Sequence, residues 1–251
     1  VLHPTAHAEP PLYLRLFDAT FHLPSAFGFL TEEERQLVRR RFDFRRPSSV
    51  LGVGVDLDVH GDGAAFREAH GLEERPYLVY VGRIDPDKGA EELYAFFLAH
   101  KARRPGPLAL VMVGEAVKPL PPHPDVVVTG FVDDSLKRSA VAGAVALVHP
   151  SYYESFSMAL TEAWAQRKAA LVQGHCDVLL GQARRSGGAI PYFGFAEFEA
   201  AVELLLADVE LAGRLGEAGR RYVETQYPWP VVLDRYEALL RTTARLGRLS
   251  A

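Results

Sequence analysis

The chain has little of what marks disulfide-stabilised, secreted or membrane-spanning proteins. Its 251 residues include one cysteine, Cys176, which excludes an intramolecular disulfide and fits a reducing compartment. No apolar run approaches the roughly 18 residues of a spanning helix, and no signal-peptide pattern is present. The 28 Lys and Arg are mixed with 32 Asp and Glu, without a basic stripe of the kind that binds nucleic acid. We therefore expect a cytoplasmic protein with no nucleic-acid partner.

Common cofactor and metal motifs are also missing. No G-x-G-x-x-G follows an apolar strand, which argues against a nicotinamide-dependent Rossmann enzyme. The sequence contains neither an H-E-x-x-H nor a C-x-x-C pattern, either of which would indicate a metal site. Two D-x-D triplets occur, but residues 56–58 lie in a presumed linker and residues 85–87 adjoin Lys88. We therefore expect no metal ion and no other cofactor.

The dominant pattern is an alternation of short apolar runs with stretches of helical periodicity. This pattern predicts βαβ units and an α/β fold, with a Rossmann-like parallel sheet covered by helices on both faces. The expected strands are residues 77–81, 108–113, 126–129, 144–148, 169–173 and 189–190. The expected helices are residues 90–103, 135–142, 157–167, 177–186, 195–207 and 209–222, with a final helix from about Pro230.

Residues 1–48 form a separate part of the sequence. A short strand at 26–30 and a helix at 33–42 are expected there, since Thr31 and three glutamates form a helix-start signature. A doubly wound domain needs about 100 residues or more. We therefore predict a remnant of an N-terminal domain with a linker (1–48), a complete Rossmann-like domain (49–230) and a C-terminal helix (231–251). Because residue 1 is Val, we expect a piece of a longer protein or a processed product.

The stretch from His149 to Ala165, H-P-S-Y-Y-E-S-F-S-M-A-L-T-E-A-W-A, carries the clearest functional signal. An apolar strand ends at Pro150, a loop carries Glu154, and a helix that starts near Ser157 carries Glu162. Free N–H groups at a helix start attract anions, whereas carboxylates accept hydrogen bonds from hydroxyl groups. The stretch therefore predicts a site for a ligand with both phosphate and hydroxyl groups, such as a nucleotide-sugar.

This stretch resembles the E-x7-E motif of retaining glycosyltransferases of the GT-B fold, family 4 in particular. Four further segments resemble that family in the same order along the chain. They are G-V-G-V-D at 52–56, Y-L-V-Y-V-G-R-I-D-P-D-K-G at 77–89, L-V-M-V-G-E at 110–115 and T-G-F-V-D at 129–133. The resemblance covers roughly residues 49 to 240. In that family the last helix crosses back towards the N-terminal domain.

The resemblance implies roles for individual residues. Arg83 and Lys88 would clamp a diphosphate at the carboxyl end of the first strand of the large domain and stabilise the leaving group without a metal. Glu154 would contact hydroxyls of the donor sugar, and Glu162 the hydroxyls of the ribose. Gly82 would let the backbone approach the ligand. From the residues alone, a solvated loop with Lys88 paired to Asp85 or Asp87 is the alternative.

Two further segments each allow two interpretations. Phe131 and Val132 resemble the loop that sandwiches the nucleotide base, with core packing of Phe131 as the alternative. Ser155, Phe156, Ser157 and Met158 stand where the family has G-F-G-L. Serine is strained there if the turn requires positive φ. If the turn requires only close approach, the serine hydroxyls can cap the helix or touch the sugar.

Residues beside the site are given structural roles. We expect His149 to be a satisfied structural histidine, Cys176 a small buried residue and Asp177 a helix N-cap. His175 could touch a sugar hydroxyl, although a lone histidine is more often structural.

The resemblance implies a retaining glycosyltransferase that moves a sugar from a nucleoside diphosphate-sugar to an acceptor hydroxyl, in glycan or glycolipid synthesis. The acceptor could be a saccharide, a lipid-linked molecule or a small molecule, and the base stays open. Any membrane association is expected to depend on the absent N-terminal region, which would also hold most of the acceptor site. A non-catalytic nucleotide-sugar-binding module is the main alternative, and a GT-B-like epimerase or phosphorylase is a weaker one.

Overall fold

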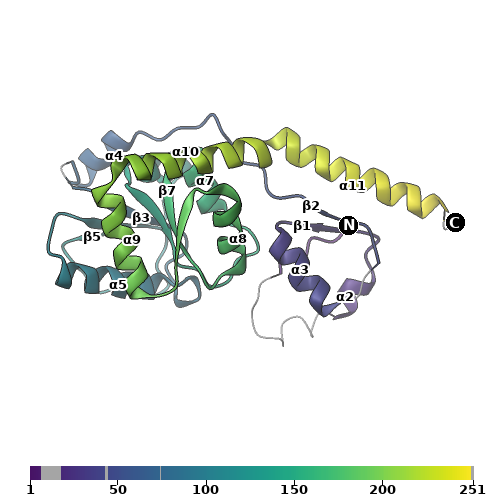
Figure 1. Ribbon diagram of the computed structural model, residues 1–251, viewed down its shortest axis with the longest axis horizontal. Coiled ribbons are helices and arrows are strands. Elements are labelled where there is room, and N and C mark those ends of the chain that lie inside the picture. The colour runs from purple at the N-terminus through teal and green to yellow at the C-terminus, as the bar shows by residue number, and fades with distance from the viewer. Residues whose placement is uncertain (7–17, 43–44, 74, 250–251) are drawn as a thin grey trace.

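The computed structural model describes residues 1–6, 18–42, 45–73 and 75–249. Figure 1 shows a larger unit built around a sheet and a smaller unit that contains the N-terminal elements, with a long C-terminal helix that starts at the edge of the larger unit and runs across the smaller one. The larger sheet is six-stranded and parallel throughout. The predicted Rossmann-like α/β fold is therefore present.

The larger sheet has the strand order β5-β4-β3-β6-β7-β8. Its strands are β3 (Tyr77–Val81), β4 (Ala109–Val113), β5 (Val126–Gly130), β6 (Ala146–His149), β7 (Ala169–Gln173) and β8 (Ala189–Tyr192). Each predicted strand is found, and 77–81 and 169–173 agree at both ends. The strand expected at 144–148 begins later because Ala144 caps the preceding helix, its N–H donating to the carbonyl of Val141.

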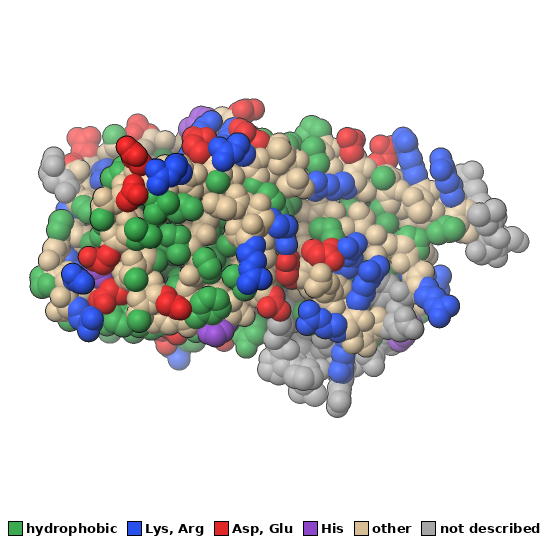
Figure 2. Space-filling model, viewed as in Figure 1, with side chains coloured by type: hydrophobic (Ala, Val, Ile, Leu, Met, Phe, Trp, Pro, Cys, Tyr) green, Lys and Arg blue, Asp and Glu red, His purple; other side chains and the backbone are tan. Residues whose placement is uncertain are grey.

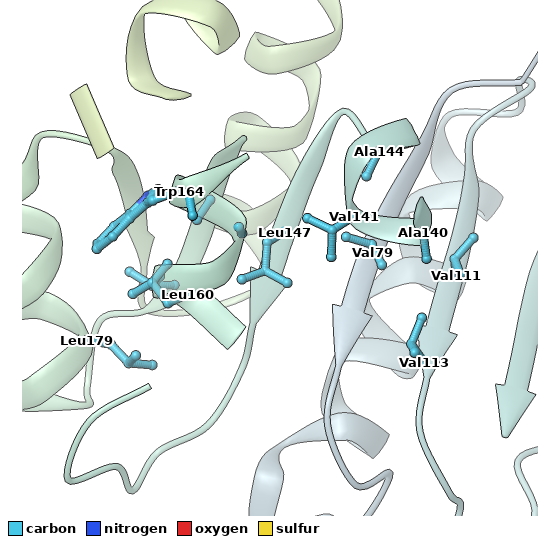
Figure 3. Close-up of a cluster of buried hydrophobic side chains, with 14 of the residues drawn as sticks. Val79, Val111, Val113, Ala140, Val141, Ala144, Leu147, Leu160, Trp164 and Leu179 are labelled. Atoms are coloured by element: carbon cyan, nitrogen blue, oxygen red, sulfur yellow. The ribbon is translucent and has the colours of Figure 1, made fainter. Parts of the chain in front are cut away.

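Helices cover both faces of this sheet. The buried side chains of α5 (Ala90–Arg103) and α9 (Phe195–Ala207) pack on one face. Those of α4 (Gly63–Ala69), α6 (Asp134–Gly143), α7 (Met158–Ala165), α8 (Asp177–Ser186) and α10 (Val209–Gln226) pack on the other. Figure 3 shows Val79, Val111 and Leu147 of the strands pointing towards Val141 and Leu160 of the helices.

Several helix boundaries differ from the predicted ones for local reasons. The helix expected at 157–167 ends at Ala165, because Gln166 caps it and Arg167 has a φ of 58°. Cys176, not Asp177, is the N-cap of α8, and Asp177 is its first helical residue. The helix expected at 209–222 continues to Gln226. The short helix α4, which the periodicity does not predict, is capped by Asp62 and buries Phe66.

The smaller unit contains α2 (Asp18–His22), β1 (Phe27–Phe29), α3 (Glu32–Arg41) and β2 (Ser48–Val50). The strand and helix predicted there are present, and β2, which was not predicted, pairs in parallel with β1. Thr31 caps α3 by accepting the N–H of Glu34. The side chain of Glu34 accepts the N–H groups of Ala6 and Leu30, at 2.7 and 2.6 Å. These bonds hold the chain on both sides of β1 against the start of α3.

The final helix, α11 (Trp229–Leu249), joins the two units. It packs against β2, and Leu239 and Tyr236 contact Leu51 and Ala26 of the smaller unit. Figure 1 shows it continuing from the end of α10 across β1 and β2. None of the helices within the described ranges is long and apolar enough to cross a membrane.

Candidate functional site

The predicted site residues converge where the strand order reverses, at the carboxyl ends of β3 and β6. In open parallel sheets this switch point leaves a crevice between two loops that run in opposite directions, and ligands bind there. The loop after β3 carries Gly82, Arg83 and Lys88, and the loop after β6 carries Glu154. The fold therefore brings together two segments that lie more than sixty residues apart, as in the separation of Lys88 and Glu154.

Asp85 organises the loop after β3. Its buried carboxylate accepts the N–H of Lys88 at 2.9 Å, caps the short 3-10 helix η1 (Pro86–Lys88) and pairs with the guanidinium of Arg83. The Tyr80 hydroxyl donates to the carbonyl of Arg83 at 2.6 Å. The alternative in which Asp85 neutralises the Lys88 side chain is wrong, because Asp85 bonds the Lys88 backbone and leaves its ammonium group to another carboxylate.

Gly89 ends this loop in a conformation that favours glycine. Its φ is 69°, and a Cβ atom there would lie 2.4 Å from the carbonyl oxygen of Pro150. The loop after β3 can therefore touch the loop after β6, and Lys88 reaches Glu154 with 2.8 Å between Nζ and Oε1. A backbone contact thus positions the cation and carboxylate of the site.

These groups line a pocket of about 280 Å³. Its walls include Gly82, Lys88, Glu154, Ser157, Met158 and Glu162, all predicted site residues, together with Tyr80, Val81, Lys137, His149 and Ala159. Both cations are paired: Lys88 with Glu154, and Lys137 with Glu162. Such a pocket can bind an anionic group at the ammonium ions and hydroxyl groups at the carboxylates.

The start of α7 opens into this pocket without strain at the serines. Ser157 has a φ of −164° and caps the helix by accepting the N–H of Leu160 at 3.2 Å. Ser155 is not among the described non-glycine residues with positive φ. The capping alternative is therefore the correct one for Ser157. The amide groups of Met158 and Ala159 belong to the first turn, where a helix leaves N–H groups for an anion.

Lys137 is a site residue that the sequence analysis missed. Its Nζ lies 3.0 Å from a carboxylate oxygen of Glu162 and 3.0 Å from one of Asp134. Burial lowers the pKa of Lys137, but the bonds to Asp134 and Glu162 outweigh it and raise the pKa above its usual value. The available signal was the spacing of Asp134 and Lys137 on one helix, whereas the contact with Glu162 is tertiary.

Other predicted site residues lie outside the pocket. Arg83 does not line the pocket; its side chain is 63% exposed and pairs with Asp85. Phe131 is 87% exposed, so core packing of Phe131 is wrong. Val132 is half-buried against the core. Phe156 is buried and meets the ring of Tyr227 edge-on.

His149 and Cys176 lie beside Glu154. Cys176 is buried as expected, and burial raises the pKa of its thiol to about 11, so it is protonated at neutral pH. His149 is buried too, but neither ring nitrogen has a hydrogen-bond partner among the described residues, which contradicts a satisfied structural histidine. Burial lowers the pKa of His149, Lys88 adds to this, and Glu154 opposes it, so the imidazole is neutral.

A second pocket, of about 240 Å³, lies between α3 and α8. It is lined by Glu33, Glu34 and Arg40 of the smaller unit and by Glu154, which also lines the first pocket. The two units are joined beside it. Thr31 donates to the carbonyl of Ser155 at 3.0 Å, and Arg185 forms two hydrogen bonds to Glu33.

The described residues contain no group of three His, Cys, Asp or Glu side chains arranged to hold a metal ion. Acidic and basic side chains are interspersed over the face of the larger unit in Figure 2.

Comparison with curated proteins gives relatives that are about twice as long. The chain is 28% identical over 200 residues to the alpha-D-kanosaminyltransferase of Streptomyces kanamyceticus, covering 74% of this chain and 50% of that protein. It is 31% identical over 203 residues to the GDP-mannose-dependent alpha-mannosyltransferase of Mycolicibacterium smegmatis, covering 74% and 51%. The chain thus spans about half the length of the curated relatives it matches.

Solved structures share the fold. Sucrose-phosphate synthase from Thermosynechococcus elongatus superposes with a TM-score of 0.78 at 21% identity, covering 95% of this chain and 63% of that one. HepE of Anabaena in complex with UDP-glucose superposes with a TM-score of 0.79 at 13% identity, covering 93% and 68%. The family described as glycosyl transferases group 1 matches residues 63–222, which contain the sheet and the first pocket. The chain belongs to this glycosyltransferase family, which has the GT-B fold.

Proposed function

We propose that this chain binds a nucleoside diphosphate-sugar in the pocket between β3 and β6, as the donor half of a retaining glycosyltransferase. The observation that carries the proposal is the pair formed by Lys88 and Glu154 across the switch point, with the start of α7 beside it. Lys88 and the α7 amides suit phosphate oxygens, whereas Glu154 and Glu162 suit hydroxyl groups. The complex of HepE with UDP-glucose, a protein of the same fold, supports this type of ligand.

In this proposal each charged group has one role. Lys88, together with Arg83 from the same loop, binds the diphosphate and stabilises the charge that develops on it. Glu154 orients the sugar through its hydroxyls, and Glu162 binds the ribose hydroxyls. The bond from the anomeric carbon to the diphosphate oxygen breaks while the bond to the acceptor oxygen forms on the same face. The acceptor proton passes to the leaving diphosphate, so no protein nucleophile is needed.

The proposed acceptor carries a hydroxyl group and enters from the side of α3, where the second pocket also reaches Glu154. A saccharide, a lipid-linked saccharide or a small molecule fits this description, in glycan or glycolipid synthesis in the cytoplasm. The protein uses no metal ion in this mechanism, since Arg83 and Lys88 neutralise the diphosphate.

Titration calorimetry with two ligands and two variants tests the donor site. The ligands are pyrophosphate and the nucleoside diphosphate, among UDP, GDP and ADP, that the unmodified chain binds. Lys88→Ala should weaken both by about 1.5–3 kcal/mol, the size of a hydrogen bond to a charged group. Glu162→Ala should weaken only the nucleotide, because pyrophosphate has no ribose. Arg241→Ala on α11 removes a similar charge from an exposed position and is the control.

Binding of none of the three nucleotides would refute the donor site. Binding without turnover, on donor and any acceptor tested, would favour a second function, a nucleotide-sugar-binding module. The observation that favours this alternative for the chain itself is that it spans about half the length of the curated relatives it matches. A turnover assay on this chain beside a chain extended at its N-terminus separates the two functions.

A further inference from the structure

His149 is a buried polar residue that the proposed mechanism does not use. It ends β6, its side chain is 8% exposed, and it lines the first pocket beside Lys88 and Glu154. Neither Nδ1 nor Nε2 has a hydrogen-bond partner among the residues that the structure describes. Buried polar groups are nearly always hydrogen-bonded, and an exception at a pocket wall points to a ligand group that completes it.

The position of the ring relative to Glu154 indicates what that ligand group is. Nε2 lies 3.6 Å from Oε1 of Glu154, beyond the range of a good hydrogen bond. Two atoms at this separation can both lie about 2.8 Å from a third atom, which is the usual hydrogen-bond distance. That third atom must accept from an imidazole N–H and donate to a carboxylate. A hydroxyl oxygen does both.

We propose that His149 is a specificity-determining residue of the donor pocket. Its Nε2–H and the Oε1 atom of Glu154 together bind one hydroxyl group of the transferred sugar. This inference rests on the proposed function, because it assumes that the sugar occupies the pocket. It favours donors with a free hydroxyl at the position that faces this pair and disfavours sugars deoxygenated there. A missing hydroxyl leaves the buried Nε2–H of His149 unpaired, whereas Glu154 keeps its bond from Lys88.

The chain offers a matched control. His100, on α5, is 2% exposed, and its Nε2 lies 3.5 Å from a carboxylate oxygen of Glu203. It resembles His149 in burial and in its acidic neighbour, but it does not line the first pocket. A substitution at His100 therefore reports the effect of altering a buried histidine without altering the proposed sugar contact.

The experiment compares a nucleotide with its sugar-bearing form by titration calorimetry. The ligand pairs are UDP with UDP-glucose and GDP with GDP-mannose, and the pair that the unmodified chain binds is used. The measured quantity is the ratio of the affinity for the nucleotide-sugar to that for the nucleotide. The variants are His149→Gln, whose amide can reach the place of Nε2, and His149→Asn, whose amide stops near Nδ1. His100→Gln is the control.

The proposal expects the ratio to fall at least tenfold in His149→Asn and to stay within threefold in His149→Gln and His100→Gln. A ratio within threefold in His149→Asn, or an equal fall in both His149 variants, would overturn it. If the unmodified chain binds neither nucleotide, the result counts against the donor site itself and not against the role of His149.

A measurement on the unmodified protein covers the case in which a variant does not fold. With ¹⁵N-labelled histidine, UDP-glucose (or GDP-mannose) should shift the Nε2 resonance of His149 and slow the exchange of its proton, whereas the nucleotide alone should not. The spectrum of whichever His149 variant folds, Gln or Asn, assigns the resonance by the signal that is missing from it. Identical spectra with the nucleotide and the nucleotide-sugar would overturn the proposal.

Discussion

Replacing Gly89 by alanine tests how the first pocket, between the loops after β3 and β6, is assembled. The φ of 69° at this residue costs an L-residue about 1–2 kcal/mol. The added Cβ would also lie 2.4 Å from the carbonyl oxygen of Pro150, a backbone atom that cannot rotate aside. Overpacking of this kind adds about 1–3 kcal/mol. The expected loss in the free energy of unfolding is therefore about 2–5 kcal/mol.

Gly71→Ala separates the two contributions. Gly71 has a φ of 63°, but a Cβ atom there would meet nothing within 4 Å. This variant should lose only about 1–2 kcal/mol from the backbone conformation. Urea denaturation of both variants measures the difference, which we attribute to the contact with Pro150.

The same comparison extends to ligand binding. If Gly89→Ala forces the loop after β3 away from Pro150, Lys88 moves away from Glu154, and pyrophosphate affinity should fall about tenfold, or 1.4 kcal/mol. Gly71→Ala should bind pyrophosphate like the unmodified chain. Equal stability losses in both variants, with pyrophosphate affinity unchanged in Gly89→Ala, would refute the idea that this close approach builds the pocket.

Three further predictions concern the helix caps and the joint between the units. Ser157→Ala should lower the free energy of unfolding by about 1 kcal/mol and Ser157→Gly by only a few tenths, because glycine tolerates the cap position; equal losses in urea denaturation would count against the cap. Burial raises the pKa of Glu34 from 4.5 to about 7, so the native state holds this proton more tightly than the unfolded chain does. The contribution of this group to the free energy of unfolding should therefore be largest below pH 4.5 and should fall as pH rises to about 7, by up to about 1.4 kcal/mol per pH unit. Glu34→Gln should remove this fall. If the difference in stability between pH 5 and 7 is the same in the variant, the assignment is contradicted. Glu33→Ala breaks the pair with Arg185 and should cost about 0.2–1 kcal/mol at low salt and less at high salt; a salt-independent loss would show that packing dominates.

The core of the larger unit could be predicted from the sequence because its signals are local. Runs such as 77–81 are apolar throughout and match a strand buried on both faces, as β3 is. By contrast, β2 is a three-residue strand, S-S-V, with no apolar alternation, and it exists because β1 lies beside it. The short helix α4 likewise depends on burying Phe66 against the core.

The charged pairs of the site were less predictable because they too depend on contacts between segments that are distant in the sequence. The motif spacing located Lys88 and Glu154 but did not indicate that they pair, because this depends on the approach of Gly89 to Pro150. For Phe131 the sequence left base binding and core packing open, and only the structure removes the core alternative, because the residue is 87% exposed. The unpaired nitrogens of His149 could not be predicted either, because they follow from what the fold fails to place around them.

Glu154 connects these observations, because its carboxylate lines both pockets. On one side it accepts a hydrogen bond from Lys88 and faces His149. On the other side it faces α3. Thr31, which caps α3, donates a hydrogen bond to the carbonyl of Ser155, the residue that follows Glu154. The hydrogen bond from Thr31 to Ser155 thus ties the loop that carries this carboxylate to the smaller unit. In the proposed mechanism the acceptor and the donor sugar approach Glu154 from its two sides, so this one side chain would contact both substrates.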